Sequence, residues 1–487
     1  MKMSSLKKYA ALLLVLLVPS LIWAEGARET ETEEIQASQA RYVFLFIGDG
    51  MALTQINAAE AYLKSQTETD VGVEKLAFSQ FPNQGLTTTY DAGSFITDSA
   101  SAGTAIATGH KTLSGVINMD TSKSIKYTTI AEMAKAAGMK VGVISSVNLD
   151  HATPACFYAK EASRNNYYNI GVQLANSNFD YFAGGMLRLD KTPQGQKNVH
   201  EIMAEKGWLI ASNRNELRAL RPGTRQVYAY SKGFAGNALD YAMDMKTDTI
   251  SLAEYTSRGI ELLDNENGFF MMVEGGKIDW ACHANDAAAS INDTIAFDNA
   301  VKEAVDFYNR HPEETLIIVT GDHETGGLSL GFAGTKYDSA FTEIGRQKMS
   351  FEAFDHYVLK PFKQNNPTGS LAQLMPEIRK NFGIDSLSPY ESELLENAFN
   401  ASMKGVGEDE ESYLLYGGYE PISVTLTHIL NNRAGLAWAS YSHTGVPVAT
   451  FALGVGGELF NGYYDNTEIF RKAATVLGLG VPVLASR

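Results

Sequence analysis

The segment Tyr42–Gly50 reads YVFLFIGDG, an apolar run that ends in a Gly-Asp-Gly turn, and Thr315–His323 repeats the pattern as TLIIVTGDH. Continuous apolar runs of this length are typical of strands buried on both faces of a parallel sheet. Ligand sites of open α/β sheets lie at the carboxyl ends of such strands. A lone Asp after a strand is more often a helix N-cap. The repetition of the pattern favours a shared site for Asp49, Asp322 and His323.

The rest of the chain alternates between strand and helix patterns. We expect further strands at Lys140–Ser145, at Gly268–Val273 (followed by Glu274) and at Val448–Leu453. We expect helices at Tyr127–Ala137, Leu252–Leu263, Asp286–Asn309 and Ile422–Leu430. This alternation predicts an α/β fold, a three-layer sandwich whose largely parallel central sheet is covered by helices on both faces. Residues 331–440 have fewer strand patterns, so we expect an insertion subdomain there, beside a main domain formed by residues 41–330 and 441–487.

The composition is that of an ordinary globular protein. The chain has 487 residues, of which 45% are hydrophobic and 20% charged, and its net charge is −16. So acidic a chain is poorly suited to nucleic acid, whose phosphates attract basic surfaces, and is better suited to cations. The two cysteines, Cys156 and Cys282, are too few for a disulfide framework. We expect them to be unpaired, buried thiols.

The amino-terminal residues have the pattern of an export signal. Three lysines precede an apolar run, and a small residue, Ala24, marks a cleavage point, so residues 1–24 are interpreted as a secretory signal peptide. The alternative is an uncleaved membrane anchor. The polar, acidic residues 25–40 are predicted to be a disordered tether. No later stretch is a candidate membrane span, and we expect an exported protein, periplasmic or extracellular.

Three of the nine histidines stand in settings that suit a metal ligand. His283 follows Asp279 by four residues, which places both side chains on one face of a helix. His323 follows Asp322 directly, and His443 lies in a Ser-His-Thr-Gly turn. Carboxylate and imidazole together suit Zn²⁺. A single histidine is more often structural, and four others are interpreted in that way: His200, His311, His356 and His428.

Two further residues have the chemistry of an anion site. Ser99 lies in TDSASAGTA, where small residues are expected to begin a helix whose free N–H groups and dipole favour an anion. An ordinary N-cap serine is the alternative. The segment is not a G-x-S-x-G elbow, which argues against α/β-hydrolase chemistry. Arg164 offers a planar fork matched to phosphate oxygens, although a surface role is equally open.

Six segments taken together resemble the alkaline phosphatase family. They are IGDGM (47–51), TDSASAGTA (97–105), HATPA (151–155), VEGGKID (273–279), TGDH (320–323) and SHTG (442–445). The resemblance implies hydrolysis of phosphate monoesters at alkaline pH through a phosphoserine on Ser99, with Arg164 holding the phosphate. It also implies two zinc ions and a third, magnesium, site. The implied ligands are Asp279, His283 and His443 for the first zinc, Asp49, Asp322 and His323 for the second, and Asp49, Thr153 and Glu274 for magnesium.

Two positions depart from the pattern of many family members. Trp280 stands where many have Lys or His, which leaves one phosphate contact missing. His151 stands where some have Asp, and a histidine there would weaken or alter the metal preference of the third site. The acidic charge predicts no nucleic-acid surface, and the sequence pattern predicts no membrane span once the signal peptide is removed. The resemblance implies small phosphate monoesters as substrates and a homodimer, as in many relatives.

Two other functions stay open at this stage. A phosphodiesterase or nucleotide pyrophosphatase could use the same architecture, although a second ester group would crowd Arg164. A phosphate-binding protein without catalysis would need an anion site but no activated nucleophile. A sulfatase is disfavoured, because the formylglycine precursor motif is absent around Ser99.

Overall fold

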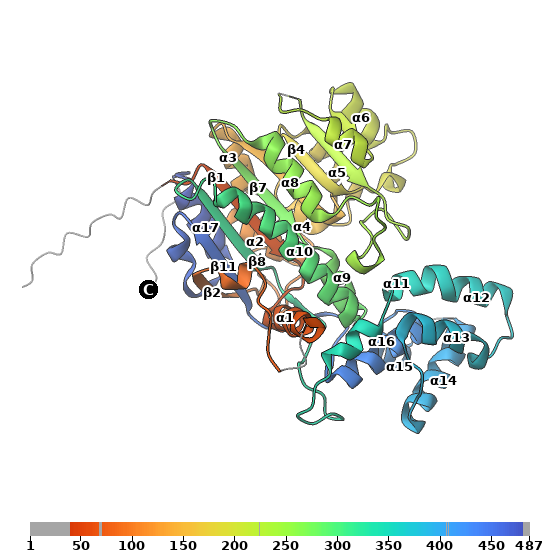
Figure 1. Ribbon diagram of the computed structural model, residues 1–487. Coiled ribbons are helices and arrows are strands. Elements are labelled where there is room, and N and C mark those ends of the chain that lie inside the picture. The colour runs from red at the N-terminus through yellow and green to blue at the C-terminus, as the bar shows by residue number, and fades with distance from the viewer. Residues whose placement is uncertain (1–38, 68–70, 224, 406, 408, 481–487) are drawn as a thin grey trace, which may run out of the picture. The chain divides into compact units, whose positions relative to one another are not determined.

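The computed structural model describes residues 39–67, 71–223, 225–405, 407 and 409–480 (Figure 1). Its main feature is a ten-stranded sheet. In spatial order the strands are β12 (Gly462–Asp465), β2 (Asn83–Thr88), β11 (Val448–Gly454), β8 (Thr315–Gly321), β1 (Tyr42–Gly48), β7 (Phe269–Glu274), β3 (Lys140–Asn148), β4 (Tyr181–Gly185), β6 (Val227–Ser231) and β5 (Leu209–Ala211).

The sheet is largely parallel, as predicted. Among the ten strands described for this sheet, only β11 runs against its neighbours, β2 and β8. At the centre, β1 pairs in parallel with β7 on one side and with β8 on the other. The register sets Ile47 opposite Glu274, and Gly48 opposite Gly321. The carboxyl ends of these three strands therefore meet at one edge of the sheet.

Helices cover both faces of the sheet, which confirms the three-layer α/β fold. Along β1, Tyr42, Phe44 and Phe46 pack into one apolar cluster, while Val43, Leu45 and Ile47 pack into another, because strand side chains alternate. The first cluster is covered by α1 (Leu53–Thr67), α7 (Arg214–Ala219), α8 (Leu252–Leu263) and α10 (Ala287–Tyr308) (Figure 1). The second is covered by α2 (Ser99–Thr108), α3 (Ile130–Ala136), α4 (Ala152–Ala155), α5 (Tyr167–Asn176), α6 (Val199–Glu205) and α17 (Thr467–Val476).

The segment between β9 (Glu324–Thr325) and β10 (His443–Thr444) is mainly helical. It contains α11 (Phe351–Phe354), α12 (Lys360–Asn365), α13 (Leu371–Phe382), α14 (Pro389–Lys404), α15 (Glu410–Tyr416) and α16 (Pro421–Ala434). A separate apolar cluster, with Phe354, Phe382 and Leu426 among its members, holds most of these helices together. The described residues nevertheless form one compact unit. The division into a catalytic domain and an insertion therefore stays a prediction.

The predicted elements are present, with small shifts at their ends. The helix predicted at Tyr127–Ala137 begins at Ile130, because the Thr129 side chain caps it and Glu132 completes a capping box. Seven short strands among the described residues were not predicted, among them β4 (YFAGG) and β2 (NQGLTT), whose composition lacks a strand pattern. Cys156 and Cys282 are buried and unpaired, as expected.

The amino-terminal predictions lie outside the described part of the chain. The signal peptide falls wholly outside it, and so does the tether except for Gln39 and Ala40. Within the described ranges, every helix is too short or too polar to cross a bilayer.

Candidate active site

The carboxylates predicted to share a site do converge at one edge of the sheet. Asp49 follows β1, Glu274 ends β7, and Asp322 and His323 follow β8, and all four side chains are fully buried. Because β1 lies between β7 and β8, their carboxyl ends are adjacent, as expected for a ligand site in an open sheet.

Three groups of side chains at this edge could each hold a metal ion. They are Asp49 with Asp322 and His323, Asp49 with His151 and Glu274, and Asp279 with His323 and His443. Within each group the potential ligand atoms lie within 4.8 Å of one another. Asp49 and His323 belong to two groups each, so the three groups form one continuous cluster.

The remaining predicted ligands, His283 and Thr153, lie at the border of this cluster. His283 is the last residue of α9 (Lys277–His283), the helix that also carries Asp279. The Nε2 atom of His283 lies 3.4 Å from Asp279 Oδ1. The same Nε2 is 3.2 Å from His443 Nε2. Thr153 Oγ1 donates to Asp49 Oδ2 over 3.3 Å. The structure thus brings together every residue that was predicted as a ligand.

Backbone carbonyls orient two of the imidazoles. His283 Nδ1 lies 2.6 Å from the carbonyl oxygen of Tyr441, and His443 Nδ1 lies 2.8 Å from that of Thr97. A carbonyl can only accept, so Nδ1 carries the proton and Nε2 is left as a lone-pair donor that faces the cluster. Hydrogen bonds of this kind fix the tautomer and ring angle of metal-ligating histidines.

Ser99 stands at the start of α2, next to the cluster. Its side chain is buried, and its Oγ lies 3.3 Å from His323 Nε2. Asp98 is the N-cap, whose side chain accepts from the amide of Ser101. The helix needs small residues because it packs closely on α4: a Cβ at Gly103 would come within 2.9 Å of Cys156 Sγ. Because Asp98 is the N-cap, Ser99 is the first residue of the helix rather than its cap.

Arg164 is tied to the same helix start. Its Nη1 donates to Asp98 Oδ2 over 2.9 Å, and its Nη2 lies 3.0 Å from His151 Nε2. Burial acts to raise the pKa of Asp98, but the Arg164 charge and hydrogen bonds from Ser101 outweigh it and hold the pKa at about 2. Arg164 is thus a held cation beside Ser99, and the surface role left open by the sequence does not fit its position.

The carboxylates of the cluster are crowded and incompletely partnered. Burial raises the pKa of Asp49 well above its ordinary value, and the charges of Asp322, Asp279 and Glu274 raise it further. Burial also raises the pKa of Glu274 to about 7 and that of Asp322 to about 8. Among the described residues, Asp49 Oδ1, Glu274 Oε1 and Asp322 Oδ2 have no hydrogen-bond partner. Such a cluster is costly by itself, and a cation within it would remove the cost.

Sequence reasoning missed several supporting residues. Ser145 of β3 lies opposite Glu274 in the register and donates a short hydrogen bond to Glu274 Oε2. Thr325 Oγ1 donates to Asp279 Oδ1 over 2.5 Å. Neither residue is in a pattern that could have indicated it, because each contact arises from strands brought together by folding.

The other noted residues fall into two sets. Trp280 meets the ring of His151, a member of the cluster, edge to face with centroids 5.8 Å apart, so Trp280 borders the cluster. Burial lowers the pKa of His151 to about 3, with Arg164 and Arg188 adding to this. The histidines interpreted as structural contact groups outside the cluster: His200 packs on Tyr228, His311 on Phe307, His356 on Phe234, and His428 Nε2 lies 3.0 Å from Asn285 Oδ1.

Fold and site together define an α/β protein with a buried cluster of potential metal ligands beside a serine and an arginine. Comparison with known proteins makes this specific. The family model for alkaline phosphatase matches residues 40–479, and the chain belongs to that family. It is an enzyme of the phosphoric monoester hydrolase type.

Similar proteins extend over nearly the whole chain. Alkaline phosphatase 4 of Bacillus subtilis is 29% identical, with 96% of this chain and 97% of that protein covered. The cold-active alkaline phosphatase of Shewanella sp. is 30% identical, with a TM-score of 0.74 over 90% of this chain and 99% of that one. The Thermus thermophilus alkaline phosphatase is 26% identical, with a TM-score of 0.76 over 92% and 94%.

Proposed function

We propose that the chain hydrolyses phosphate monoesters at alkaline pH through a phosphoserine on Ser99, with two zinc ions and one magnesium ion bound. One observation carries the proposal: Ser99 Oγ lies 3.3 Å from a ligand-type imidazole of His323, while the adjacent residue, Asp98, holds Arg164. Nucleophile, cation site and phosphate-binding guanidinium are thus next to one another.

The residues present fit the proposed ions. Asp279, His283 and His443 form a mixed carboxylate and imidazole set, and Asp49, Asp322 and His323 form another, as Zn²⁺ prefers. Asp49, Thr153 and Glu274 supply only oxygen, as Mg²⁺ prefers. The unpartnered oxygens of Asp49, Glu274 and Asp322 are what a cation would satisfy. When bound, two such ions lower the pKa of coordinated oxygen and offset charge on the attacking and leaving oxygens.

The chain's own residues account for positioning. Ser99 attacks phosphorus from the N-terminus of α2, whose free amides and dipole favour the phosphate. Arg164 binds two non-bridging oxygens through its planar fork, and Asp98 holds that fork in place. A monoester presents two charged oxygens and a diester only one, so this arrangement favours monoesters. Water then cleaves the phosphoserine and frees Ser99 for another cycle.

The first experiment combines metal analysis with a paired assay on the purified protein. We expect two zinc ions per chain and turnover of an aryl phosphate monoester that is lost on chelation and restored by zinc. The matching aryl diester should be a poor substrate. Dominant diester turnover would replace the proposal with a phosphodiesterase. Tight phosphate binding with no turnover of either ester would replace it with a binding protein.

The remaining features of the proposal concern the whole molecule. We propose export to the periplasm or beyond after cleavage at Ala24, which amino-terminal sequencing of the mature protein tests. We propose that residues 331–440 are an insertion subdomain beside the catalytic domain of residues 41–330 and 441–487, with which limited proteolysis should agree. A homodimer is proposed from the family resemblance, and light scattering would measure it.

A further inference from the structure

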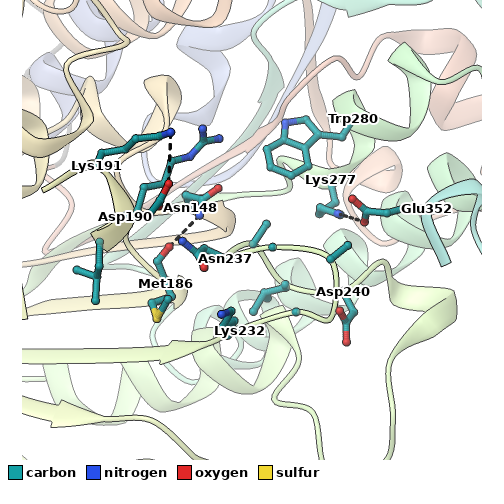
Figure 2. A pocket seen from close by; sticks show the side chains of 17 residues that line it. Asn148, Met186, Asp190, Lys191, Lys232, Asn237, Asp240, Lys277, Trp280 and Glu352 are labelled. Atoms are coloured by element: carbon teal, nitrogen blue, oxygen red, sulfur yellow. Dashed lines mark hydrogen bonds and ion pairs between the residues drawn. The ribbon is translucent and has the colours of Figure 1, made fainter. Parts of the chain in front are cut away.

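A cavity of about 600 Å³ lies at the same edge of the sheet as the candidate active site (Figure 2). Asn148 ends β3, Met186 follows β4 and Lys232 follows β6, so the cavity lies at the carboxyl ends of three parallel strands. Figure 2 shows these side chains with Trp280 and Lys277 of α9 at one side of the cavity. A cavity of this size accommodates a small molecule.

A β-bulge shapes this part of the sheet. The pairing of β3 with β4 shifts register between Ser145 and Asn148. Gly184 lies opposite with φ of +129°, and a Cβ there would come within 1.7 Å of the Ser145 carbonyl oxygen. Bulges re-aim side chains next to sites. Here the Asn148 amide faces the cavity and donates to the carbonyl oxygen of Met186 over 2.8 Å.

Two of the cationic groups that line the cavity are already partnered. Lys277 is buried, and its Nζ lies 3.2 Å from Glu352 and 3.6 Å from the Tyr241 ring centre. Lys191 Nζ lies 3.3 Å from Asp190. These pairs contribute polarity to the lining but little net charge.

Two other cations lack a carboxylate at ion-pair distance within the described residues. The Arg188 guanidinium lies 4.3 Å from the Tyr167 ring centre, and Lys232 is exposed at the rim. The remaining carboxylate of the lining, Asp240, accepts a hydrogen bond from the amide of Phe234 over 2.8 Å. The cavity therefore has an excess of positive charge in a chain whose net charge is −16. Such a local field attracts anions.

Trp280 connects this cavity with the candidate phosphate site. Its ring lines the cavity and meets the ring of His151, whose Nε2 lies 3.0 Å from Arg164. Arg164 is held beside Ser99 through Asp98. Trp280 is thus shared between the lining of the cavity, which includes Lys232 and Arg188, and the residues next to Arg164.

We propose that this cavity binds a second anionic group, such as a phosphonate or carboxylate, carried on the alcohol portion of the phosphate monoester. The inference rests on the proposed monoesterase function and deepens it, because it names the substrate class. The enzyme then selects monoesters whose leaving alcohol is itself anionic. Arg188 and Lys232 supply the selecting charges.

The test uses two series of substrates with alkyl chains of increasing length. One series is ω-phosphonoalkyl phosphates, whose phosphonate end resists hydrolysis, and the other is ω-hydroxyalkyl phosphates of the same lengths. At one favoured length, we expect the phosphonate to raise kcat/KM roughly tenfold, mainly through KM, as for a charge-assisted hydrogen bond. Raising the salt concentration should reduce the preference, because the cavity is open to solvent.

Variants localise the effect. Lys232→Glu and Arg188→Gln should each abolish most of the preference while leaving turnover of p-nitrophenyl phosphate unchanged. Lys206→Glu is the matched control, since Lys206 is the exposed residue that follows α6 and does not line the cavity, and it should retain the preference.

Three results would overturn the inference. The first is that the phosphonate series is not preferred at any chain length, and the second is that Lys206→Glu loses the preference as much as the cavity variants do. The third is that free methylphosphonate inhibits the enzyme and Lys232→Glu relieves this inhibition, while no chain length is preferred, which would indicate a site for a free anion. A wild-type enzyme inactive on p-nitrophenyl phosphate would instead contradict the proposed function itself, so the two failures are distinguishable.

Discussion

Asp98 has two roles that substitutions can separate. It caps α2 by accepting from the Ser101 amide, and it pairs with Arg164 Nη1 at 2.9 Å. Asn is as good an N-cap as Asp but has no charge. Asp98→Asn therefore keeps an acceptor for the Ser101 amide but removes the charge and the Oδ2 acceptor that Arg164 and the Gly115 amide share, whereas Asp98→Ala removes the cap as well. The two variants measure the two roles in one background.

The magnitudes follow from the structure. The pKa of Asp98 is lowered from 3.8 to about 2. At about 1.36 kcal/mol for each pKa unit, this net shift, in which the Arg164 charge and the hydrogen bonds from Ser101 and Arg164 outweigh burial, corresponds to about 2.4 kcal/mol of stabilisation of the folded state at neutral pH. The cap adds about 1 kcal/mol. We expect Asp98→Asn to lower the free energy of unfolding by about 2 kcal/mol and Asp98→Ala by about 3 kcal/mol.

The assay is urea denaturation of the metal-loaded protein, followed by tryptophan fluorescence over a range of pH. A group whose pKa is lowered in the folded state stabilises that state at pH values above its unfolded-state pKa. This stabilisation is lost as the pH falls through the folded-state pKa. The difference between wild type and Asp98→Asn should therefore be constant from pH 8 to about 5 and shrink between about 4 and 2. An Asn variant as stable as wild type at pH 7, or one no more stable than Ala, would refute the reasoning.

Four further predictions concern the site. Ser99→Ala should lower monoester turnover by about 10³-fold or more with metal content unchanged; normal rates with aryl phosphate would reject the serine. Arg164→Gln should lower kcat/KM for an aryl monoester by roughly 10²-fold and for the diester far less, and equal losses would contradict dianion recognition. His151→Asp should add a third oxygen anion beside Asp49 and Glu274 and tighten magnesium binding, measured by titration calorimetry. In metal-stripped protein, the raised pKa values of Glu274 (about 7) and Asp322 (about 8) mean that the folded state binds more protons than the unfolded state. The melting temperature of this protein should therefore fall as the pH rises from about 4 to 8, and adding zinc should restore it. A melting temperature independent of pH would contradict this prediction.

Much of the fold was predictable because the central strands carry their own pattern. The runs at β1, β7 and β8 are apolar throughout, since both of their faces are covered. Strands β2 and β12, at one end of the sheet, are less buried and contain Gly, Asn and Asp, so their pairing depends on neighbours rather than on composition. Their position is decided by the sheet that they join.

Some features of the candidate site were likewise predictable from the sequence, and others were not. The identity of the ligand-type residues and the direction of the strands that carry them are local properties. The sequence alone could therefore place Asp49, Glu274 and Asp322 at one edge of a parallel sheet. It could not show that Asp98 holds Arg164, or that Ser145 lies opposite Glu274.

What the sequence by itself determined is which chemistry this protein carries and the layer architecture that supports it, because residue type and periodicity are read along one segment at a time. Only the tertiary structure decided the pairing of Asp98 with Arg164, the unpartnered oxygens of the buried cluster and the cationic cavity beyond Trp280. The physical reason is that desolvation and charge pairing depend on distances between segments far apart in the chain, which no local pattern encodes.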